Sequence, residues 1–199
     1  MFGWAEDREA SLRQGITDAR KAISIDSRDY FAHFSLGRLQ TLAGDHTTAI
    51  RALETSVDIN PNFAHGYYGL AAAQDFVGHA EKAIENADLA IRLSPNDPLM
   101  WAFLIHKGYA HYCLDDLDQA IDAAERACQI PTAQFIPFAW LAAMYVHAGR
   151  MQDARKALEN ARRLEPNLSI TYVKGILRTA QGVGIERLYD GLRKAGLPE

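Results

Sequence analysis

The chain has 199 residues, of which 48% are hydrophobic and 23% are charged, and its formal net charge at pH 7 is −4. This composition is ordinary for a globular protein and excludes the collagen-like, disordered and disulfide-scaffold classes. No apolar run approaches the ~20 residues that cross a bilayer, and the acidic start lacks the basic and apolar regions of a secretory signal. With only Cys113 and Cys128, a reduced, cytoplasmic compartment is expected.

A repeat of 34 residues organises most of the sequence. Ala49 and Ala83 are separated by this period, and so are Pro61 and Pro95. The four repeat units begin at Tyr30, Ala64, Trp101 and Phe135. Within each unit the apolar residues recur every three to four positions, as they do on one face of a helix. Each unit is therefore predicted to form two amphipathic helices.

In chain order, the first predicted element is an incomplete repeat. Residues 6–25 have the pattern of a second helix without its partner, with Trp4 beside it, so we expect a fragment of a longer chain. At the other end, residues 168–181 are predicted to form a first helix. A break at Gly182–Gly184 follows, and a short helix over 185–195 is expected to close the stack. The predicted organisation is a partial repeat, four repeats within 30–166, and capping helices: 1–29, 30–63, 64–97, 98–134, 135–168 and 167–199.

Glycine at position 15 of units one, two and four is expected to end the first helix, because glycine tolerates a positive φ. In unit three that position is Asp115, and Asp115 or Asp116 is expected to cap the second helix instead. Unit three is also three residues longer than the period. We interpret the extra residues as nearly one more turn of its first helix, with Pro98 near the N-terminal position that accepts proline.

A 34-residue helix–turn–helix with this pattern resembles the tetratricopeptide repeat, or TPR. The residues that match the family's preferences are Leu36, Gly37, Ala49, Leu53, Pro61, Tyr67, Leu70, Ala83, Ala90, Pro95, Gly108, Ala120, Ala127, Leu141, Tyr145, Ala154, Leu158, Ala161 and Pro166. The resemblance covers residues 30–166. It implies an all-α fold, a right-handed superhelical solenoid of antiparallel helix pairs.

The C-terminal stretch from Glu186 to Glu199, together with Leu93–Pro98, resembles a narrower bacterial group. In that group a TPR array follows a class III adenylate cyclase catalytic domain or a winged-helix transcriptional domain. The resemblance implies that such a domain precedes residue 1 in a parent protein. The cyclase domain's metal-binding aspartates and its sheet have no counterpart in this sequence, so cyclase activity is expected only of a longer chain.

No arrangement of residues in the sequence indicates catalysis. Glycine-rich phosphate and dinucleotide loops are absent, and so is the His-Glu-x-x-His zinc motif. His106 and His111 are five residues apart and diverge around a helix, and the acidic cluster at 115–122 suits a helix N-terminus. Cys113 and Cys128 are expected to be small buried hydrophobic residues. We therefore predict a protein that is not an enzyme, with no catalytic residue, cofactor or metal.

Charge is distributed unevenly along the chain. Residues 1–149 carry a net charge of −8, whereas residues 150–199 carry +4. The basic side chains of the last full repeat are expected to form a solvated helix face. Nucleic-acid-binding domains usually have an overall basic excess, so neither a nucleic acid nor a membrane is expected as a partner.

In the TPR family the first helices line a concave groove, and by resemblance the stripe at positions 2, 5, 9 and 12 faces it. Here that stripe is aromatic in the middle and carries few charges. Aromatic side chains are common in binding hot spots, although rings in these places also fill space between repeats. The candidate partner-binding residues are Phe34, Arg38, His65, Tyr68, Asp75, Phe76, Tyr109 and Tyr112. If the groove binds a partner, the three tyrosines are expected to be partly exposed.

The leading hypothesis is a non-catalytic protein–protein interaction module that binds a peptide or a helix in this groove, as a regulatory part of a larger bacterial signalling protein. Phe34, Tyr68 and Ile105 at position 5 disfavour the polar clamp that chaperone-tail binders of the family use. One alternative is a cis-regulatory region of an adenylate or guanylate cyclase. Another is a small-molecule-binding array, which requires a closed apolar cavity at Tyr109 and Tyr112. The identity of the partner is open, and so is self-association.

Overall fold

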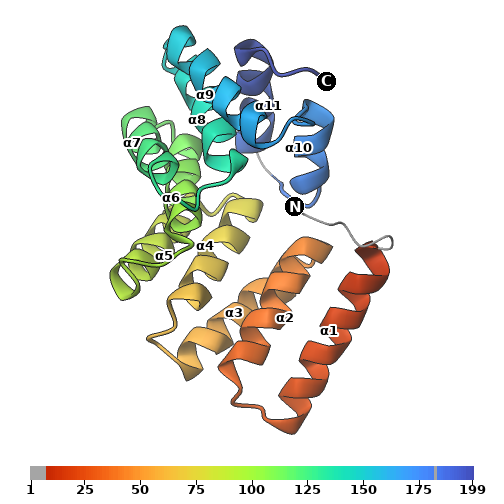
Figure 1. Cartoon of the computed structure of the whole chain (residues 1–199). Helices are drawn as coiled ribbons and strands as arrows, with labels where there is room; N and C mark the ends of the chain where they lie inside the picture. Colours follow the sequence, from red (N-terminus) through yellow and green to blue (C-terminus); the bar gives the residue numbers. More distant parts are fainter. Residues whose placement is uncertain (1–7, 182) are drawn as a thin grey trace.

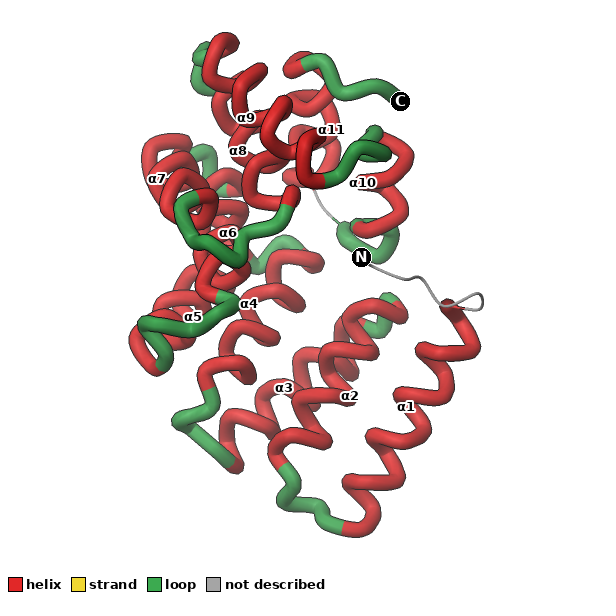
Figure 2. Tube along the Cα trace, in the orientation of Figure 1, coloured by secondary structure: helices red, strands yellow, loops and turns green. Residues whose placement is uncertain are grey.

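The computed structural model describes residues 8–181 and 183–199, which form eleven helices and no strand (Figure 1, Figure 2). The helices are α1 (Arg8–Ile25), α2 (Tyr30–Ala43), α3 (His46–Ile59), α4 (Ala64–Val77), α5 (Ala80–Leu93), α6 (Met100–Cys113), α7 (Leu117–Cys128), α8 (Phe135–His147), α9 (Met151–Leu164), α10 (Ile170–Ile176) and α11 (Val183–Ala195). The all-α prediction is confirmed for this part of the chain. Trp4 lies outside the described residues.

Four helix pairs follow the predicted units. The contacts of α2 with α3, α4 with α5, α6 with α7 and α8 with α9 are the most extensive between helices. The first helix of each pair is followed by a residue in the left-handed region: Gly44 (φ 89°), Gly78 (φ 78°), Asp115 (φ 63°) and Gly149 (φ 75°). Asp116 then caps α7, because its carboxylate accepts a hydrogen bond from the Gln119 amide. The turn residues predicted from the repeat are thus confirmed.

Small residues allow the paired helices to approach closely. The alanines at position 20 are completely buried: Ala49, Ala83, Ala120 and Ala154. A Cβ atom on Gly108 would lie 3.0 Å from the carbonyl oxygen of Ala120, and one on Gly37 would lie 3.0 Å from that of Ala49. The same backbone contact therefore recurs in two repeats, which explains why the sequence keeps small residues at this period.

The three extra residues of unit three lie in a turn. α6 begins at Met100 and has 14 residues, the same length as α2 and α4. The preceding turn is held by Asp97, whose carboxylate accepts hydrogen bonds from the Leu99 amide at 2.8 Å and the Ser94 hydroxyl at 3.0 Å. The prediction of a longer first helix is wrong, because this turn absorbs the insertion and Pro98 stays outside the helix.

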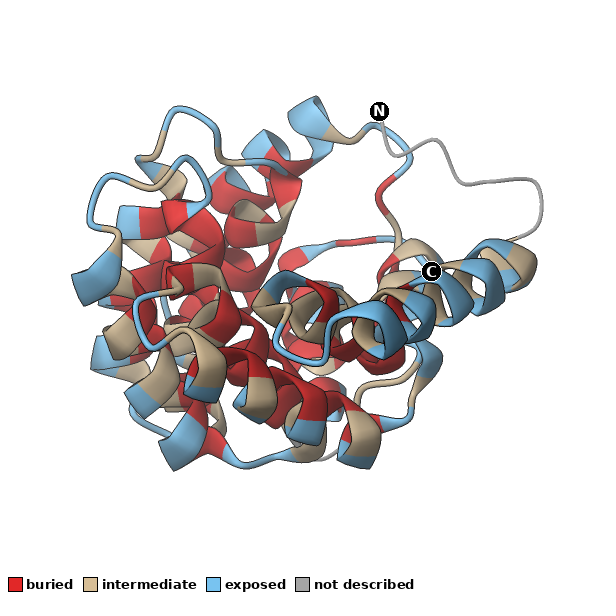
Figure 3. Cartoon of the chain, turned by 90° about the horizontal axis from the view of Figure 1, so that it is seen from below, coloured by how far each residue is buried: buried red, intermediate tan, exposed pale blue. Residues whose placement is uncertain are grey.

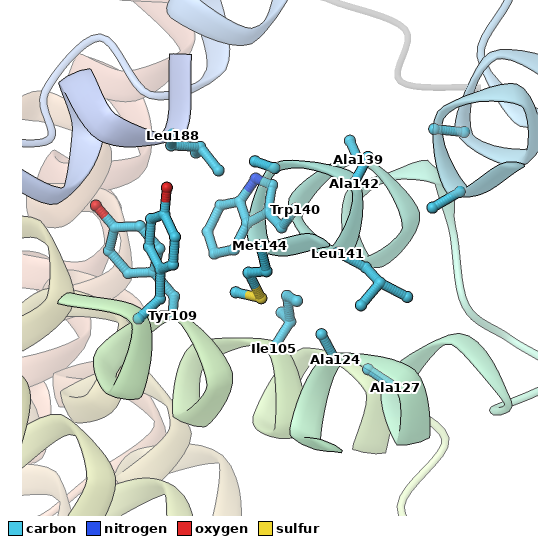
Figure 4. Packing of buried hydrophobic residues seen from close by; sticks show 14 of the residues in the cluster. Ile105, Tyr109, Ala124, Ala127, Ala139, Trp140, Leu141, Ala142, Met144 and Leu188 are labelled. Carbon is cyan, nitrogen blue, oxygen red and sulfur yellow. The ribbon is translucent and has the colours of Figure 1, made fainter. Parts of the chain in front are cut away.

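The largest apolar core lies in the C-terminal half of the chain. Its completely buried side chains include Phe103, Tyr112, Met144, Leu188 and Leu192. Figure 3 shows the buried residues concentrated where helices face one another, and Figure 4 shows Leu188 of α11 pointing toward the ring of Trp140 on α8. The C-terminal helix is thus part of the same core as the repeat helices.

The C-terminal segment differs from the predicted cap. α10 has only seven residues, and residues 177–181 leave the helix. α11 packs mainly on α8 and makes smaller contacts with α9, α10 and α6. The expectation that α11 covers residues 168–181 holds only in part, because α11 contacts α10, whose Ile170 and Val173 are buried, but packs mainly on α8. α8 is apolar around most of its circumference and therefore needs a covering helix on a second side.

A substitution at Gly191 tests the packing of α11 against α8. A Cβ atom there would lie 2.8 Å from the Cβ of Ala143 and 3.0 Å from its carbonyl oxygen, whereas one on Gly175 of α10 would meet nothing within 4 Å. We expect Gly191→Ala to lower the free energy of unfolding by about 1–3 kcal/mol through overpacking. Gly175→Ala should be neutral or stabilising by up to about 1 kcal/mol, because alanine favours helix. Denaturant unfolding of both variants checks this, and equal stabilities would contradict the docking of α11 on α8.

Candidate functional site

The helices α2, α4, α6 and α8 line the concave side, and their aromatic rings form a continuous series across the repeats. From Phe34 through His65, Phe103 and Tyr68 to His106, successive ring centroids are 6.5, 5.8, 5.2 and 5.6 Å apart. These contacts join adjacent repeats, because the rings come from α2, α4 and α6. The rings therefore do pack between repeats, as the alternative in the sequence analysis supposed.

The candidate residues differ in exposure. Half-buried on the concave side are Phe34, Arg38, His65, Tyr68 and Phe76. Asp75, Tyr109 and Tyr112 are buried, with 4%, 3% and 0% of their surface exposed. The expected partial exposure is therefore confirmed for Tyr68 and wrong for Tyr109 and Tyr112.

The C-terminal helix explains the burial of the two tyrosines. At the start of α11, a Cβ atom on Gly184 would lie only 2.8 Å from the hydroxyl oxygen of Tyr109. The guanidinium carbon of Arg187 lies 4.4 Å from the ring centre of Tyr112, and the same group donates to the Tyr112 carbonyl oxygen at 2.9 Å. The chain itself therefore occupies this end of the groove.

The segment before α11 also contacts the concave side, far from its own place in the sequence. The carbonyl oxygen of Thr179 accepts a hydrogen bond from Nε2 of His46 at 2.6 Å, and its hydroxyl donates to the carbonyl oxygen of Thr41 at 3.1 Å. The main-chain amide of Gln181 donates a hydrogen bond to the main-chain carbonyl oxygen of Phe76 at 2.7 Å. Residues 177–181 thus lie across the C-terminal ends of α2 and α4, held through two main-chain groups and the Thr179 hydroxyl.

Sequence reasoning missed the residues that hold this segment, His46 and Thr41 above all. Thr41 lies at position 12 of the predicted stripe but was not among the candidate residues, His46 lies outside that stripe, and their partner Thr179 is more than 130 positions away. One signal was available in the sequence of α8, Phe135–His147, which has apolar residues on nearly every side. Such a helix must be covered on two sides, which indicates an additional packing partner.

A buried acidic group lies beneath the middle of the groove. Oδ2 of Asp75 accepts a hydrogen bond from Nδ1 of His106 at 2.7 Å, and its Oδ1 has no hydrogen-bond partner among the described residues. Burial raises the pKa of Asp75 to about 6, and the hydrogen bond and charge of His106 oppose this rise. Asp75 is therefore a structural partner of His106 and not a surface contact for a ligand.

The cysteine at the concave side, Cys113, is not activated as a nucleophile. Cys113 lies beside Tyr109, but burial raises the pKa of its thiol to about 11, so the nucleophilic thiolate is disfavoured. Within residues 8–181 and 183–199, no three His, Cys, Asp or Glu side chains are grouped to hold a metal ion. In the same part of the chain, every helix is too short or too polar to cross a membrane.

The small-molecule alternative required a closed apolar cavity at the two buried tyrosines. The space beside Tyr109 measures only about 10 Å³, roughly the room that one water molecule needs. A larger cavity of about 170 Å³ lies elsewhere, next to Arg38 and Tyr68. The condition for a small-molecule site at Tyr109 and Tyr112 is therefore not met.

Comparison with known proteins identifies the fold. The structure of TTC0263, a thermophilic TPR protein in Thermus thermophilus, superposes with a TM-score of 0.68 at 21% identity, over 85% of this chain and 89% of that one. YrrB, a TPR protein with an unusual peptide-binding site, superposes with a TM-score of 0.60 at 15% identity, over 89% and 90%. The chain has the TPR solenoid fold.

The matches found by sequence cover less of the chain than the structural matches do. No family model matches the chain. Superkiller complex protein 3 of Mus musculus is 28% identical over 80 residues, which is 40% of this chain. The chain matches about 5% of the length of that relative. The likeness to TPR proteins therefore rests chiefly on the three-dimensional arrangement of the helices.

The Asp75–His106 pair predicts a pH dependence of stability. Because the pKa of Asp75 is raised to about 6 from 3.8, the folded chain binds this proton more tightly than the unfolded chain. The stability associated with protonation is fully present below pH 3.8 and is lost as the pH rises through about 6. Asp75→Asn should therefore gain stability relative to wild type between about pH 4 and pH 7.5, on the order of 1–3 kcal/mol.

Urea unfolding of both chains at the two pH values measures this difference. Asp58→Asn, at an exposed position on α3, is the matched control and should give a small difference of similar size at both pH values. If Asp75→Asn shows the same difference from wild type at both pH values, the account of a costly buried carboxylate is wrong.

Proposed function

We propose that this chain is a non-catalytic protein–protein interaction module that binds a peptide or a helix in its concave groove. The observation that carries the proposal is that the groove already contacts a non-helical turn segment of the chain, residues 177–181. Thr179 and Gln181 are held there by hydrogen bonds to Thr41, His46 and Phe76, two of them through main-chain groups of the segment itself. Such contacts are largely independent of side-chain identity, so the same kind of surface suits a segment of another protein.

The part of the groove that the C-terminal segment leaves open supports the proposal. Phe34, His65 and Tyr68 are half-buried, and 55% of the neighbouring Phe31 is exposed. Contiguous exposed apolar groups mark interaction surfaces, and aromatic rings are frequent hot spots. The shared fold with YrrB, which has a peptide-binding site, is consistent with this use of the groove.

We further propose that the module is a cytoplasmic regulatory part of a larger bacterial signalling protein. In the cyclase alternative, the groove would bind another segment of the same parent protein. Neither TTC0263, YrrB nor Superkiller complex protein 3 is described as a cyclase or a winged-helix regulator. This part of the proposal rests on the resemblance of the C-terminal sequence alone.

A peptide selected from a random library for binding to the full chain tests the groove. Tyr68→Ala should weaken the binding of that peptide by more than ~1 kcal/mol, because the substitution removes an accessible ring. The same change should cost much less stability than the ~3–5 kcal/mol typical of truncating a buried aromatic residue. Calorimetric titration measures the affinity, and thermal unfolding measures the stability.

Two further variants sharpen the result. Leu164→Ala removes a 44% exposed apolar side chain of α9, outside the groove, and should change neither quantity. Tyr109→Ala should instead lower stability strongly, because that ring is buried under α11. Unchanged affinity in Tyr68→Ala would refute the proposal, and a loss of affinity in Leu164→Ala would place the binding surface outside the groove.

A further inference from the structure

A partly enclosed cavity of about 170 Å³ lies between the four first helices and the end of α10. Its walls are mainly apolar, with the rings of Tyr68, Trp101 and Trp140 and the side chains of Ile105, Ile136 and Leu177. Pockets for drug-sized molecules measure about 300–1,000 Å³, whereas an apolar cavity of about 150 Å³ holds one benzene ring. The size of this cavity therefore suits a single side chain better than a cofactor.

One cationic group at the cavity lacks a carboxylate partner. Arg38 forms no ion pair with any described residue. Its guanidinium carbon lies 4.9 Å from the ring centre of Tyr68, and it donates a long hydrogen bond of 3.4 Å to the hydroxyl of that residue. The other basic side chain at the cavity, His106, is already paired with Asp75. A ligand in the cavity therefore meets one positive charge that no acidic side chain of the described chain balances.

We infer that the cavity receives an aromatic side chain of the peptide partner, and that an adjacent aspartate or glutamate of that partner pairs with Arg38. The inference rests on the proposed function and specifies the chemistry of its partner. The ring would contact Trp101 and Trp140, and aromatic pairs of this kind favour offset or edge-to-face contact. The carboxylate would pair with the partly desolvated guanidinium of Arg38, whose planar N–H donors match the geometry of a carboxylate.

Three capped dipeptides serve as probes: Ac-Phe-Asp-NH2, Ac-Phe-Asn-NH2 and Ac-Ala-Asp-NH2. They differ only in the ring or in the charge, and none has a free terminal carboxylate. The readout is the indole N–H resonances of Trp101 and Trp140 in the full chain, followed by NMR titration. We expect saturable shifts for Ac-Phe-Asp-NH2 with a Kd on the order of 1 mM. Its affinity should exceed that of Ac-Phe-Asn-NH2 by about three- to fivefold, and Ac-Ala-Asp-NH2 should not shift these resonances.

Variants separate the charge from the cavity. Arg38→Gln should abolish the preference for Ac-Phe-Asp-NH2 over Ac-Phe-Asn-NH2, and Arg38→Lys should restore part of it. Arg51→Gln, at an exposed position on α3, is the matched control and should leave the preference unchanged. Ala72→Leu places a larger side chain at the cavity wall and should weaken the binding of both phenylalanine peptides. Because Arg38 is half-buried at the groove, its variants are expected to fold even if Ala72→Leu does not.

Equal affinity for the two phenylalanine peptides in the wild-type chain would overturn the role of Arg38, and absence of saturable shifts would overturn the cavity. Tighter binding of 3-phenylpropanoate than of Ac-Phe-Asp-NH2 would also overturn the inference, because the site would then favour a small acid over a peptide. If these probes fail while a library-selected peptide still depends on Tyr68, only this inference falls. If that peptide is also insensitive to Tyr68→Ala, the proposed function falls with it.

Discussion

The close contact between α11 and α8 determines how much of the concave face remains free. At Gly191 the two helices approach so closely that a Cβ atom would lie 2.8 Å from the Cβ of Ala143. This approach lets Leu188 and Leu192 become completely buried and brings Arg187 onto the ring of Tyr112. Because α11 is held there, the segment before it lies across α2 and α4. The open groove is thereby limited to the end formed by α2 and α4 and to the adjoining cavity.

The local architecture could be predicted from the sequence because its signals have a fixed spacing. A glycine or aspartate in the left-handed region ends each first helix, and a buried alanine follows five residues later in all four units. These requirements are local, since a positive φ and a close helix contact each restrict one position to small or permissive residues. The pairing of the helices follows from the same repeat, so the fold could be predicted without knowledge of long-range contacts.

Which of the candidate site residues are exposed depends on contacts that the repeat pattern does not predict. Tyr109 and Tyr112 fall on the concave stripe as predicted, but they are covered by residues of α11 that lie 75 positions further along the chain. Gly191 resembles any glycine within a helix until Ala143 is placed opposite it. Similarly, the carboxylate of Asp97 accepts hydrogen bonds from the Leu99 amide and the Ser94 hydroxyl, so the three inserted residues form a turn and do not lengthen the helix. Long-range docking and turn chemistry therefore account for the differences from prediction.

The central claim is that the concave face holds a non-helical segment of polypeptide, residues 177–181, chiefly through main-chain hydrogen bonds. Amide hydrogen exchange of Gln181 in the free full-length chain tests it most directly, because this amide lies outside every helix and donates to Phe76. We expect slow exchange, comparable with that of amides in the core helix α8, since release of the segment requires breaking its contacts with α2 and α4. Exchange at the rate of an unstructured peptide would show that the groove does not hold this segment and would contradict the account.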